Sequence, residues 1–362
     1  MSQYSNPPFW KRRRLLLWLL PLGLISAMAL GWTLWTEHHP HQERELRLLA
    51  QEQLTDWFPE QMSLPDDRLG FIPRSAEALR QGQPRVLLVH GLDEPGGIWD
   101  DLVPMLDEAG IEAWEFRYPN DQAIDHSADE LAEHWPELDV EQPLVLIGHS
   151  MGGLVIRDFV SRWRHPVEQE PQVDGAVVTG VILVATPNHG SGWARLRAWL
   201  ELREWAADIA EREFSLFAGL RDGTGAAKID LRPGSQFLNE LNDRPWPESV
   251  AVRIIGGVLT EPTAAMQDGL EALAATLGSD DALEAVERWW QELGEDLGDG
   301  VVAKDSLPLP YAPPPTLVTA SHRGLLVRTP LTDDDQQPPA IEPLMAIVHE
   351  MLNAAPSPNP LP

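Results

Sequence analysis

LVLIGHSMGGLVIRDF, residues 144–159, decides how the rest of the chain can fold. An aliphatic run leads into a glycine-rich turn, and a second apolar run with helical spacing follows it. Residues 148–152 fit G-x-S-x-G, a pattern that places a serine on a sharp turn between a buried strand and a helix. Gly148 and Gly152 are needed there because the neighbouring backbone comes too close for a side chain. The stretch therefore predicts a strand, a nucleophile elbow at Ser150, and a helix.

Short apolar runs alternate with longer helical segments on both sides of this stretch, from about residue 84 onward. Several runs are almost entirely Val, Ile and Leu, as in strands that are buried on both faces. This pattern predicts an α/β fold with a mostly parallel sheet of about six strands flanked by helices. The expected strands lie at 86–89, 113–117, 144–147, 178–184, 250–255 and 316–319. The expected helices lie at about 97–108, 126–136, 152–164, 193–218, 264–293 and 341–353.

Composition and charge exclude several classes of protein. The chain has 362 residues, of which 43% are hydrophobic, so it can bury a sizeable core. It has no cysteine, and disulfides and thiolate metal sites are therefore excluded. The formal net charge is −29, and such an acidic body repels nucleic acid and anionic lipid head groups. We expect no nucleic-acid partner.

The N-terminus predicts a membrane anchor. Residues 11–14 (KRRR) precede 21 residues without a charge, from 15 to 35. At 1.5 Å per residue, a helix of that length spans the core of a bilayer. The basic run favours the cytoplasm for residues 1–14, which places the rest of the chain in the periplasm or exterior. The alternative is a signal peptide cleaved near Ala29, where Ala-Met-Ala ends, but the apolar run continues beyond it.

Residues 36–83 predict a linker that carries one short amphipathic docking helix at about 43–57. His38, His39 and His41 lie in this linker. Exposed histidines in a proline-containing linker are more often simply polar residues than metal ligands. We therefore expect no metal there.

Five short sequences follow one another in a fixed order through residues 84–355. They are HG at 90–91, GHSMGG at 148–153, ATPNHGS at 185–191, GDGVV at 298–302 and SHRGL at 321–325. Taken together they resemble the α/β-hydrolase fold, specifically its lipase and esterase branch. The resemblance implies an α/β-hydrolase domain over 84–355, with a short tail at 356–362, and the chain order nucleophile, acid, histidine.

The same resemblance implies a Ser-His-Asp triad. Ser150 would be the nucleophile, and its hydroxyl needs a base because it is a poor nucleophile at neutral pH. Among eleven histidines, His322 follows the last expected strand in a short turn, where the family places its general base. Asp299 in GDGVV matches the family's acid position. Glu261, just after the strand at 250–255, is the alternative acid.

Two backbone N–H groups are expected to bind the oxyanion of a tetrahedral intermediate. One belongs to Met151, directly after the serine, and the other belongs to Leu92. His90 lies at the end of a strand, where we expect it to shape the oxyanion loop rather than to act as a base. This chemistry requires no metal and no organic cofactor.

Two helical segments are expected to cover the pocket. The first is a cap at about 193–245, which contains Trp193, Trp199 and Trp205, and the second is an insertion at about 264–293. The tryptophan-rich face either lines an acyl pocket as part of a lid or packs its helix on the sheet. The sequence leaves both readings open.

These features together predict a membrane-anchored serine hydrolase that cleaves carboxylic esters through an acyl-enzyme. The expected substrate is a small-molecule or lipid-like ester, and the expected contact with the cytoplasmic membrane is through the N-terminal helix. A thioesterase, an acyltransferase or a phospholipase would use the same triad. A non-catalytic binding protein built on the same scaffold is an alternative from a different class.

Overall fold

The chain divides by its internal contacts into two units, Met1–Arg47 and Leu48–Pro362, and helix α2 (Pro40–Trp57) crosses the boundary between them. A computed structural model describes residues 31–32, 34–65, 68–76, 83–92, 96–138, 140–192, 223–259, 298–328 and 337–354. The expected helices at 193–218 and 264–293 lie outside these residues.

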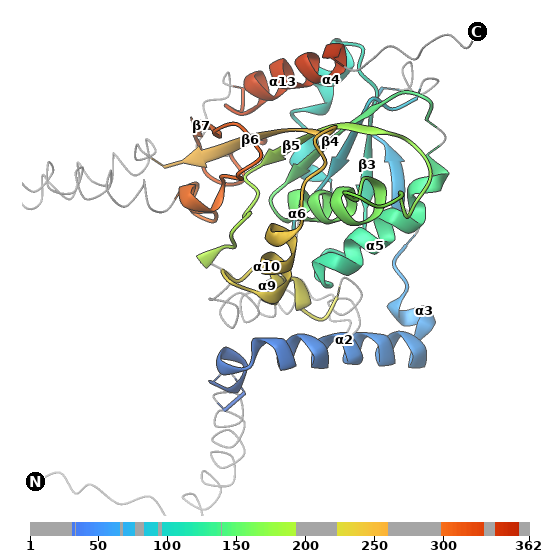
Figure 1. Ribbon diagram of the computed structural model, residues 1–362, viewed down its shortest axis with the longest axis vertical. Coiled ribbons are helices and arrows are strands. Elements are labelled where there is room, and N and C mark those ends of the chain that lie inside the picture. Colours follow the sequence, from blue (N-terminus) through green and yellow to red (C-terminus); the bar gives the residue numbers. More distant parts are fainter. Residues whose placement is uncertain are drawn as a thin grey trace, which may run out of the picture. The chain divides into compact units, whose positions relative to one another are not determined.

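The second unit is built around a seven-stranded sheet with the order β1-β3-β2-β4-β5-β6-β7 (Figure 1). The strands β2 to β7 run parallel to their neighbours, and β1 pairs with β3 antiparallel. This arrangement confirms the predicted mostly parallel sheet. The strands are β1 (Gly70–Pro73), β2 (Val86–Val89), β3 (Ala113–Arg117), β4 (Leu144–His149), β5 (Val178–Val184), β6 (Ala251–Val258) and β7 (Thr316–Thr319).

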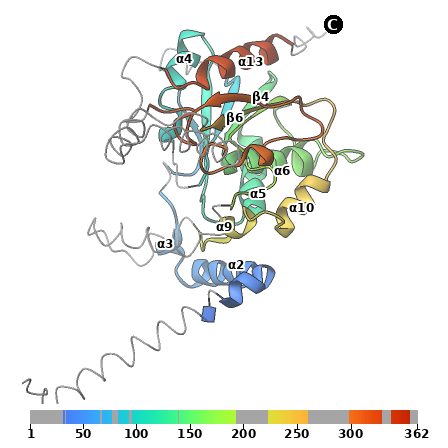
Figure 2. The same cartoon turned by 90° about the vertical axis from the view of Figure 1, so that its left-hand side faces the viewer.

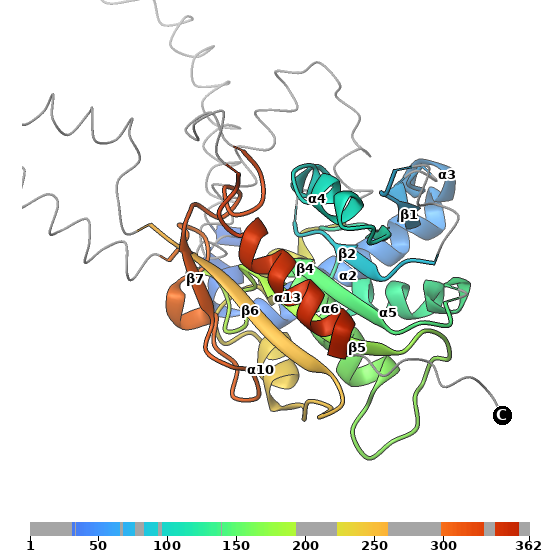
Figure 3. The same cartoon turned by 90° about the horizontal axis from the view of Figure 1, so that it is seen from above.

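Helices lie on both faces of the sheet. In Figure 1 and Figure 2, α4 and α13 lie on one face, whereas α5, α6, α9 and α10 lie on the other. Seen from above in Figure 3, α13 crosses over the central strands. The described helices that lie wholly within this unit are α3 (Pro59–Met62), α4 (Val103–Glu108), α5 (Ile124–His134), α6 (Met151–Asp158), α9 (Ala226–Asp230), α10 (Gln236–Asp243) and α13 (Ile341–Ala354). Shorter turns are η2 (Gly97–Trp99), η3 (Trp135–Glu137), the π-helical η4 (Phe159–Arg164) and η6 (Lys304–Ser306).

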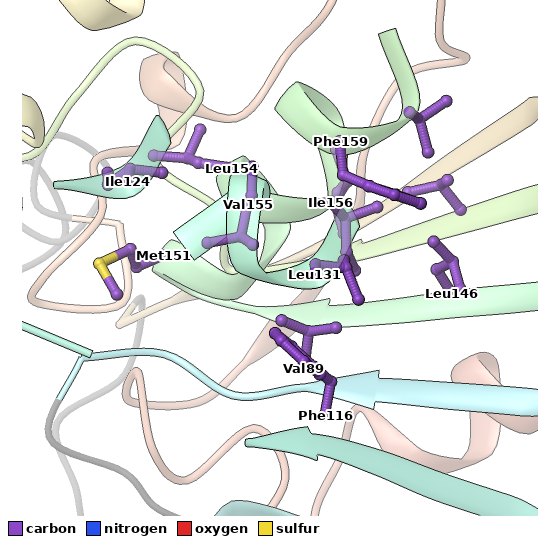
Figure 4. Packing of buried hydrophobic residues seen from close by; sticks show 14 of the residues in the cluster. Val89, Phe116, Ile124, Leu131, Leu146, Met151, Leu154, Val155, Ile156 and Phe159 are labelled. Carbon is purple, nitrogen blue, oxygen red and sulfur yellow. The ribbon is translucent and has the colours of Figure 1, made fainter. Parts of the chain in front are cut away.

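Alternate residues of the central strands supply two separate hydrophobic clusters. In β2, Val86 and Leu88 belong to the cluster beneath α4 and α13, and Leu87 and Val89 belong to the cluster beneath α5 and α6. All four side chains are fully buried, as the near-continuous apolar sequence of the strand predicts. Figure 4 shows part of the second cluster, in which apolar residues of α6 belong together with those of α5 and of the strands β2, β3 and β4. The sheet is therefore covered on both faces.

The structure corrects two expectations about the boundaries of elements. We expected about six strands beginning near residue 84, but β1 adds a strand at residues 70–73, within the expected linker. Its four residues, GFIP, are too few to show a period in the sequence, and a terminal proline argues against a central strand. The helix expected at 152–164 is α-helical only as far as Asp158 and continues as the π-helical turn η4.

Only part of the structure expected for the N-terminus falls within the described residues. The helix expected at 43–57 is present as α2, and Leu46, Leu49 and Trp57 on it are exposed. No helix among the described residues is long and apolar enough to cross a bilayer. The anchor predicted at 15–35 lies outside these residues except for positions 31, 32, 34 and 35.

Candidate active site

Ser150 lies at the junction between β4 and α6, in a backbone conformation that side chains rarely adopt. Its φ is 52° and its ψ is −126°. Such a conformation costs on the order of 1–3 kcal/mol and persists only where the surrounding structure fixes it. The Ser150 N–H donates to the carbonyl of Val184 on β5 at 2.8 Å. The backbone is therefore that of a strained strand-to-helix turn, as the G-x-S-x-G pattern predicts.

Glycines allow three stretches of backbone to meet at this turn. A Cβ on Gly148 would lie 2.6 Å from the backbone of Gly153, and a Cβ on Gly152 would collide with the carbonyl oxygens of Val89 and His90. The loop after β2 is therefore pressed against the start of α6. A Cβ on Gly91 in this loop would lie 2.9 Å from the Cβ of Ser150, so the loop also reaches the serine itself.

Asp299 and His322 form a hydrogen-bonded pair. The His322 Nδ1–H donates to Asp299 Oδ2 at 2.7 Å, which fixes the tautomer because a carboxylate only accepts. The His322 backbone N–H also donates to the Asp299 carbonyl at 3.0 Å. The carboxylate is buried, and its second oxygen, Oδ1, accepts from the N–H groups of Val301 at 2.9 Å and Val302 at 2.8 Å.

His149 connects this pair to the elbow. Its Nε2–H donates to the His322 carbonyl at 3.3 Å, and the two rings lie 4.8 Å apart between centroids. His149 is fully buried and directly precedes Ser150 in the chain. Asp299 and His322 are therefore paired, and His322 lies beside the residue that directly precedes Ser150, while the catalytic roles of all three residues stay predictions.

The loop that carries Leu92 is fixed by Tyr118. The Tyr118 hydroxyl donates to the His90 carbonyl at 2.6 Å, and the two rings stack with centroids 4.6 Å apart. Burial raises the pKa of Tyr118 well above its usual range, with a smaller contribution from the carboxylate of Glu130. The hydroxyl therefore remains a donor at every physiological pH. The structure thus supports His90 as part of the loop's framework, in the position expected from the sequence.

The comparisons with known proteins bear on what this arrangement is. A family model described as "Alpha/beta hydrolase family" matches residues 86–355, which is most of the chain.

The chain belongs to the alpha/beta hydrolase family.

This alpha/beta hydrolase is similar to several solved structures. It is 18% identical to the Bacillus licheniformis lipase BlEst2 in mature form, over 74% of this chain and 92% of that one, with a TM-score of 0.47. It is 18% identical to the metagenomic carboxyl esterase MGS0156, over 74% and 76%, with a TM-score of 0.49. For lipase 1 from Pelosinus fermentans the identity is 15%, over 75% and 99%, with a TM-score of 0.47. A search of curated proteins finds no match. Identities of 15 to 18% and TM-scores below 0.5 give no information about the substrate of this hydrolase.

Other expected features of this alpha/beta hydrolase are described only in part. Glu261, the alternative acid, lies outside the described residues, as do positions 193–222 of the expected cap. The described end of that cap contains α9 and α10. In the described part of the chain, no group of three or more His, Asp or Glu side chains is placed to hold a metal ion.

Two groups of residues in this alpha/beta hydrolase were not anticipated from the sequence. One is Tyr118, because a lone tyrosine at the end of a strand carries no signal in a single sequence. The other surrounds Arg157 on α6, whose guanidinium is buried and donates to Tyr311, Asn188 and Asn242 at 2.8 to 3.1 Å. Burial lowers the pKa of Arg157, and the Tyr311 hydroxyl opposes this effect. Only Asn188 lay in a motif that the sequence singled out, ATPNHGS.

Glu130 on α5 is a strongly perturbed carboxyl group near this framework. Burial raises its pKa to about 7, and a hydrogen bond from Gln122 partly opposes the shift. The group is half-buried on the helix that packs against α6. The protonation of Glu130 should therefore affect the stability of the helices next to the elbow.

Proposed function

We propose that this alpha/beta hydrolase cleaves carboxylic esters through an acyl-enzyme on Ser150. The observation that carries the proposal is the Asp299–His322 hydrogen bond, held against the elbow by His149. A buried carboxylate that accepts from Nδ1 leaves the opposite nitrogen, Nε2, free of the proton and able to act as a base. A serine hydroxyl needs a base of this kind beside it to attack an ester.

The proposed reaction has two steps. The Nε2 of His322 takes the Ser150 proton as Oγ attacks the ester carbonyl carbon, and the bond to the leaving alkoxide then breaks as His322 protonates it. His322 next takes a proton from water as the water oxygen attacks the acyl carbon, the bond from that carbon to Ser150 Oγ breaks as His322 returns the proton to Oγ, and the carboxylic acid is released. Asp299 stabilises the imidazolium in both steps, and the N–H groups of Met151 and Leu92 stabilise the oxyanion.

We propose further that the ester is lipid-like and that the enzyme works outside the cytoplasmic membrane. The support is in the sequence: the uncharged residues 15–35 follow a basic run, and the expected cap is rich in tryptophan and leucine. Carbonate extraction of membranes from cells that express the full chain tests the anchor, and the intact mass of the protein tests it against cleavage near Ala29. Release into the soluble fraction with loss of about 29 residues would favour the signal peptide.

The experiment that tests the reaction is hydrolysis of p-nitrophenyl esters, from acetyl to palmitoyl, by the full chain purified in detergent. Ser150→Ala should lose activity by a factor on the order of 10⁴ or more. Ser161→Ala is the matched control, because Ser161 is a buried serine outside the elbow and its hydroxyl donates to the Arg157 carbonyl. The chain length that gives the highest kcat/KM separates an esterase from a lipase.

Labelling by a fluorophosphonate completes this test. We expect Ser150 to be labelled in the wild type and in Ser161→Ala, and no label in Ser150→Ala. A folded wild type with neither activity nor label would overturn the proposal and leave a non-catalytic binding protein as the better account.

A further inference from the structure

The motif ATPNHGS at 185–191 has no role in the proposed reaction, yet four consecutive residues of it contact the loop that carries the acid. We call residues 188–191 the clamp segment and residues 298–308 the acid loop. We infer that the clamp segment positions the Asp299 carboxylate for His322, with Ser191 as a positioning residue. The inference rests on the proposed function, since it assigns a purpose to the orientation of Asp299.

The orientation of the Asp299 carboxylate depends on the backbone just after it. Oδ1 accepts from the N–H groups of Val301 and Val302, and only Oδ2 accepts from His322. If residues 301–302 shift, the carboxylate can rotate, and the direction of the bond to His322 changes with it. The geometry of the pair therefore depends on what holds residue 301.

Ser191 holds residue 301 directly. Its hydroxyl donates to the Val301 carbonyl at 2.5 Å, so Val301 accepts from Ser191 with its C=O and donates to Asp299 with its N–H. Ser191 is itself buried, and its backbone N–H donates to the Leu231 carbonyl at 2.8 Å. A chain of two hydrogen bonds thus leads from the loop after β5 to the carboxylate.

The rest of the clamp segment contacts the far end of the acid loop. The Asn188 side chain donates to the Leu307 carbonyl at 2.6 Å, and His189 Nε2–H donates to the Pro308 carbonyl at 2.9 Å. In the opposite direction, the Ser306 hydroxyl donates to the Gly190 carbonyl at 2.6 Å. Each of these bonds pairs a side chain with a backbone carbonyl, so each fixes the course of the main chain rather than one side-chain rotamer.

The clamp segment is also tied to the helix that follows the nucleophile. Arg157 on α6 donates to Asn188 Oδ1 at 3.1 Å, and the same asparagine donates to Leu307. Asn188 and Arg157 are both fully or almost fully buried. The segment therefore contacts both the helix that follows Ser150 and the loop that carries Asp299.

The test compares Ser191→Ala, Ser191→Thr and the control Ser161→Ala in the full chain. Ser161 matches Ser191 in burial, at 4% and 5% exposed, and also donates its hydroxyl to a backbone carbonyl. With a p-nitrophenyl ester, Ser191→Ala should lower kcat by roughly tenfold and leave KM within about twofold, because one buried hydrogen bond to the acid loop is lost. Ser191→Thr keeps the hydroxyl and should restore most of kcat. Ser161→Ala should keep kcat even where its melting temperature falls.

A spectroscopic readout separates positioning from general stability. The proton on His322 Nδ1 in a short bond to a carboxylate gives a low-field ¹H NMR signal, which His322→Gln identifies by its absence. We expect this signal to move or broaden in Ser191→Ala and to stay in place in Ser161→Ala. Wild-type kcat with an unmoved signal in Ser191→Ala, or the same loss of kcat in both variants, would overturn the inference. If the wild type neither hydrolyses esters nor takes the fluorophosphonate label, the proposed function fails, while the NMR signal still reports on the clamp.

Discussion

Ser150 is fixed by the packing of regular elements, whereas Asp299 and His322 lie on loops that are fixed by hydrogen bonds. The serine follows β4 and precedes α6, and glycines bring the backbone of both against the loop after β2. The acid loop contains only the short turn η6 among its described residues, and side chains of the clamp segment bind its main chain.

This difference has consequences for how the two regions respond to substitution. Close packing tolerates almost no added atom, so a change at the elbow should appear first as lost stability. Removing one side-chain-to-backbone hydrogen bond costs less stability than disturbing close packing. A change at the loops should therefore appear first as lost activity. Four variants test whether the two regions differ in this way.

The largest effect is expected at Asp299. Asp299→Asn keeps the size of the side chain but favours the wrong tautomer of His322, and kcat should fall by roughly 10⁴-fold. The melting temperature should change far less than it does in the elbow variant below. Steady-state kinetics and thermal unfolding of one preparation check both values. A loss of less than about tenfold would point to another acid, and Glu261→Gln should then carry the large effect.

The elbow should respond in the opposite way. Gly152→Ala places a Cβ against two backbone carbonyls that cannot move aside, and we expect a loss of about 3 kcal/mol in the free energy of unfolding. Gly192→Ala is the control, because a Cβ there meets no heavy atom of the described residues within 4 Å. Urea unfolding measures both variants. Equal stability of the two would show that the elbow is not closely packed.

Tyr118 tests the loop beside the elbow. Tyr118→Phe removes only the hydroxyl that donates to His90, and the looser loop should lower kcat/KM by roughly tenfold, mainly through kcat. The affinity for a boronic acid, whose adduct with Ser150 is tetrahedral and anionic, should fall by a similar factor. An unchanged boronic-acid affinity would mean that this hydroxyl does not help to place the Leu92 N–H.

The smallest effect is expected at Glu130, and it concerns stability alone. The pKa of Glu130 is about 7 in the folded chain, above its ordinary value of 4.5, so the folded state binds the proton more tightly than the unfolded state. The free energy of unfolding should therefore fall as pH rises from about 4.5 to about 7. Glu130→Gln should be more stable than the wild type by on the order of 1–2 kcal/mol at pH 8 and equal to it at pH 4.

Thermal unfolding across this pH range checks the prediction for Glu130. Glu133→Gln, an exposed change on the same helix, is the control; its carboxylate adds to the raised pKa of Glu130 less than burial does, so most of the pH dependence should stay in place. The activity of Glu130→Gln relative to wild type should not vary with pH. A pH-dependent change in kcat would place Glu130 within the catalytic framework and blur the distinction between the two regions.

The elbow and the two loops also differ in how well they could be predicted from the sequence. The position of Ser150 was accessible because its strand, turn and helix are contiguous and each has its own local pattern. Asp299 and His322 could be proposed only by resemblance, because the bond between them joins residues 23 positions apart on irregular loops. The contacts of Ser191 with Val301 span 110 positions, and no local pattern encodes a pairing of that kind.

The strands show a similar limit. Those with continuous Val, Ile and Leu were located within a few residues, since a strand that is buried on both faces must be apolar throughout. Strand β1 was not predicted because four residues are too few to show a hydrophobic period and because its partner, β3, lies about 40 positions further along the chain. The helix beyond Asp158 keeps its apolar pattern through the change to a π-helical turn, so nothing in the local pattern indicates that change.

Strand β1 has a practical consequence for work on this protein. It covers the outer side of β3, from the pair Gly70 and Arg117 to the pair Pro73 and Trp114, and its own proline and short length make it a poor template for further pairing. A chain trimmed to residues 86–355, the region by which the family is recognised, would lack β1. It would present β3 as an open edge strand with unpaired N–H and C=O groups, which invite aggregation. Solubility of the catalytic domain therefore depends on residues that lie outside its family signature.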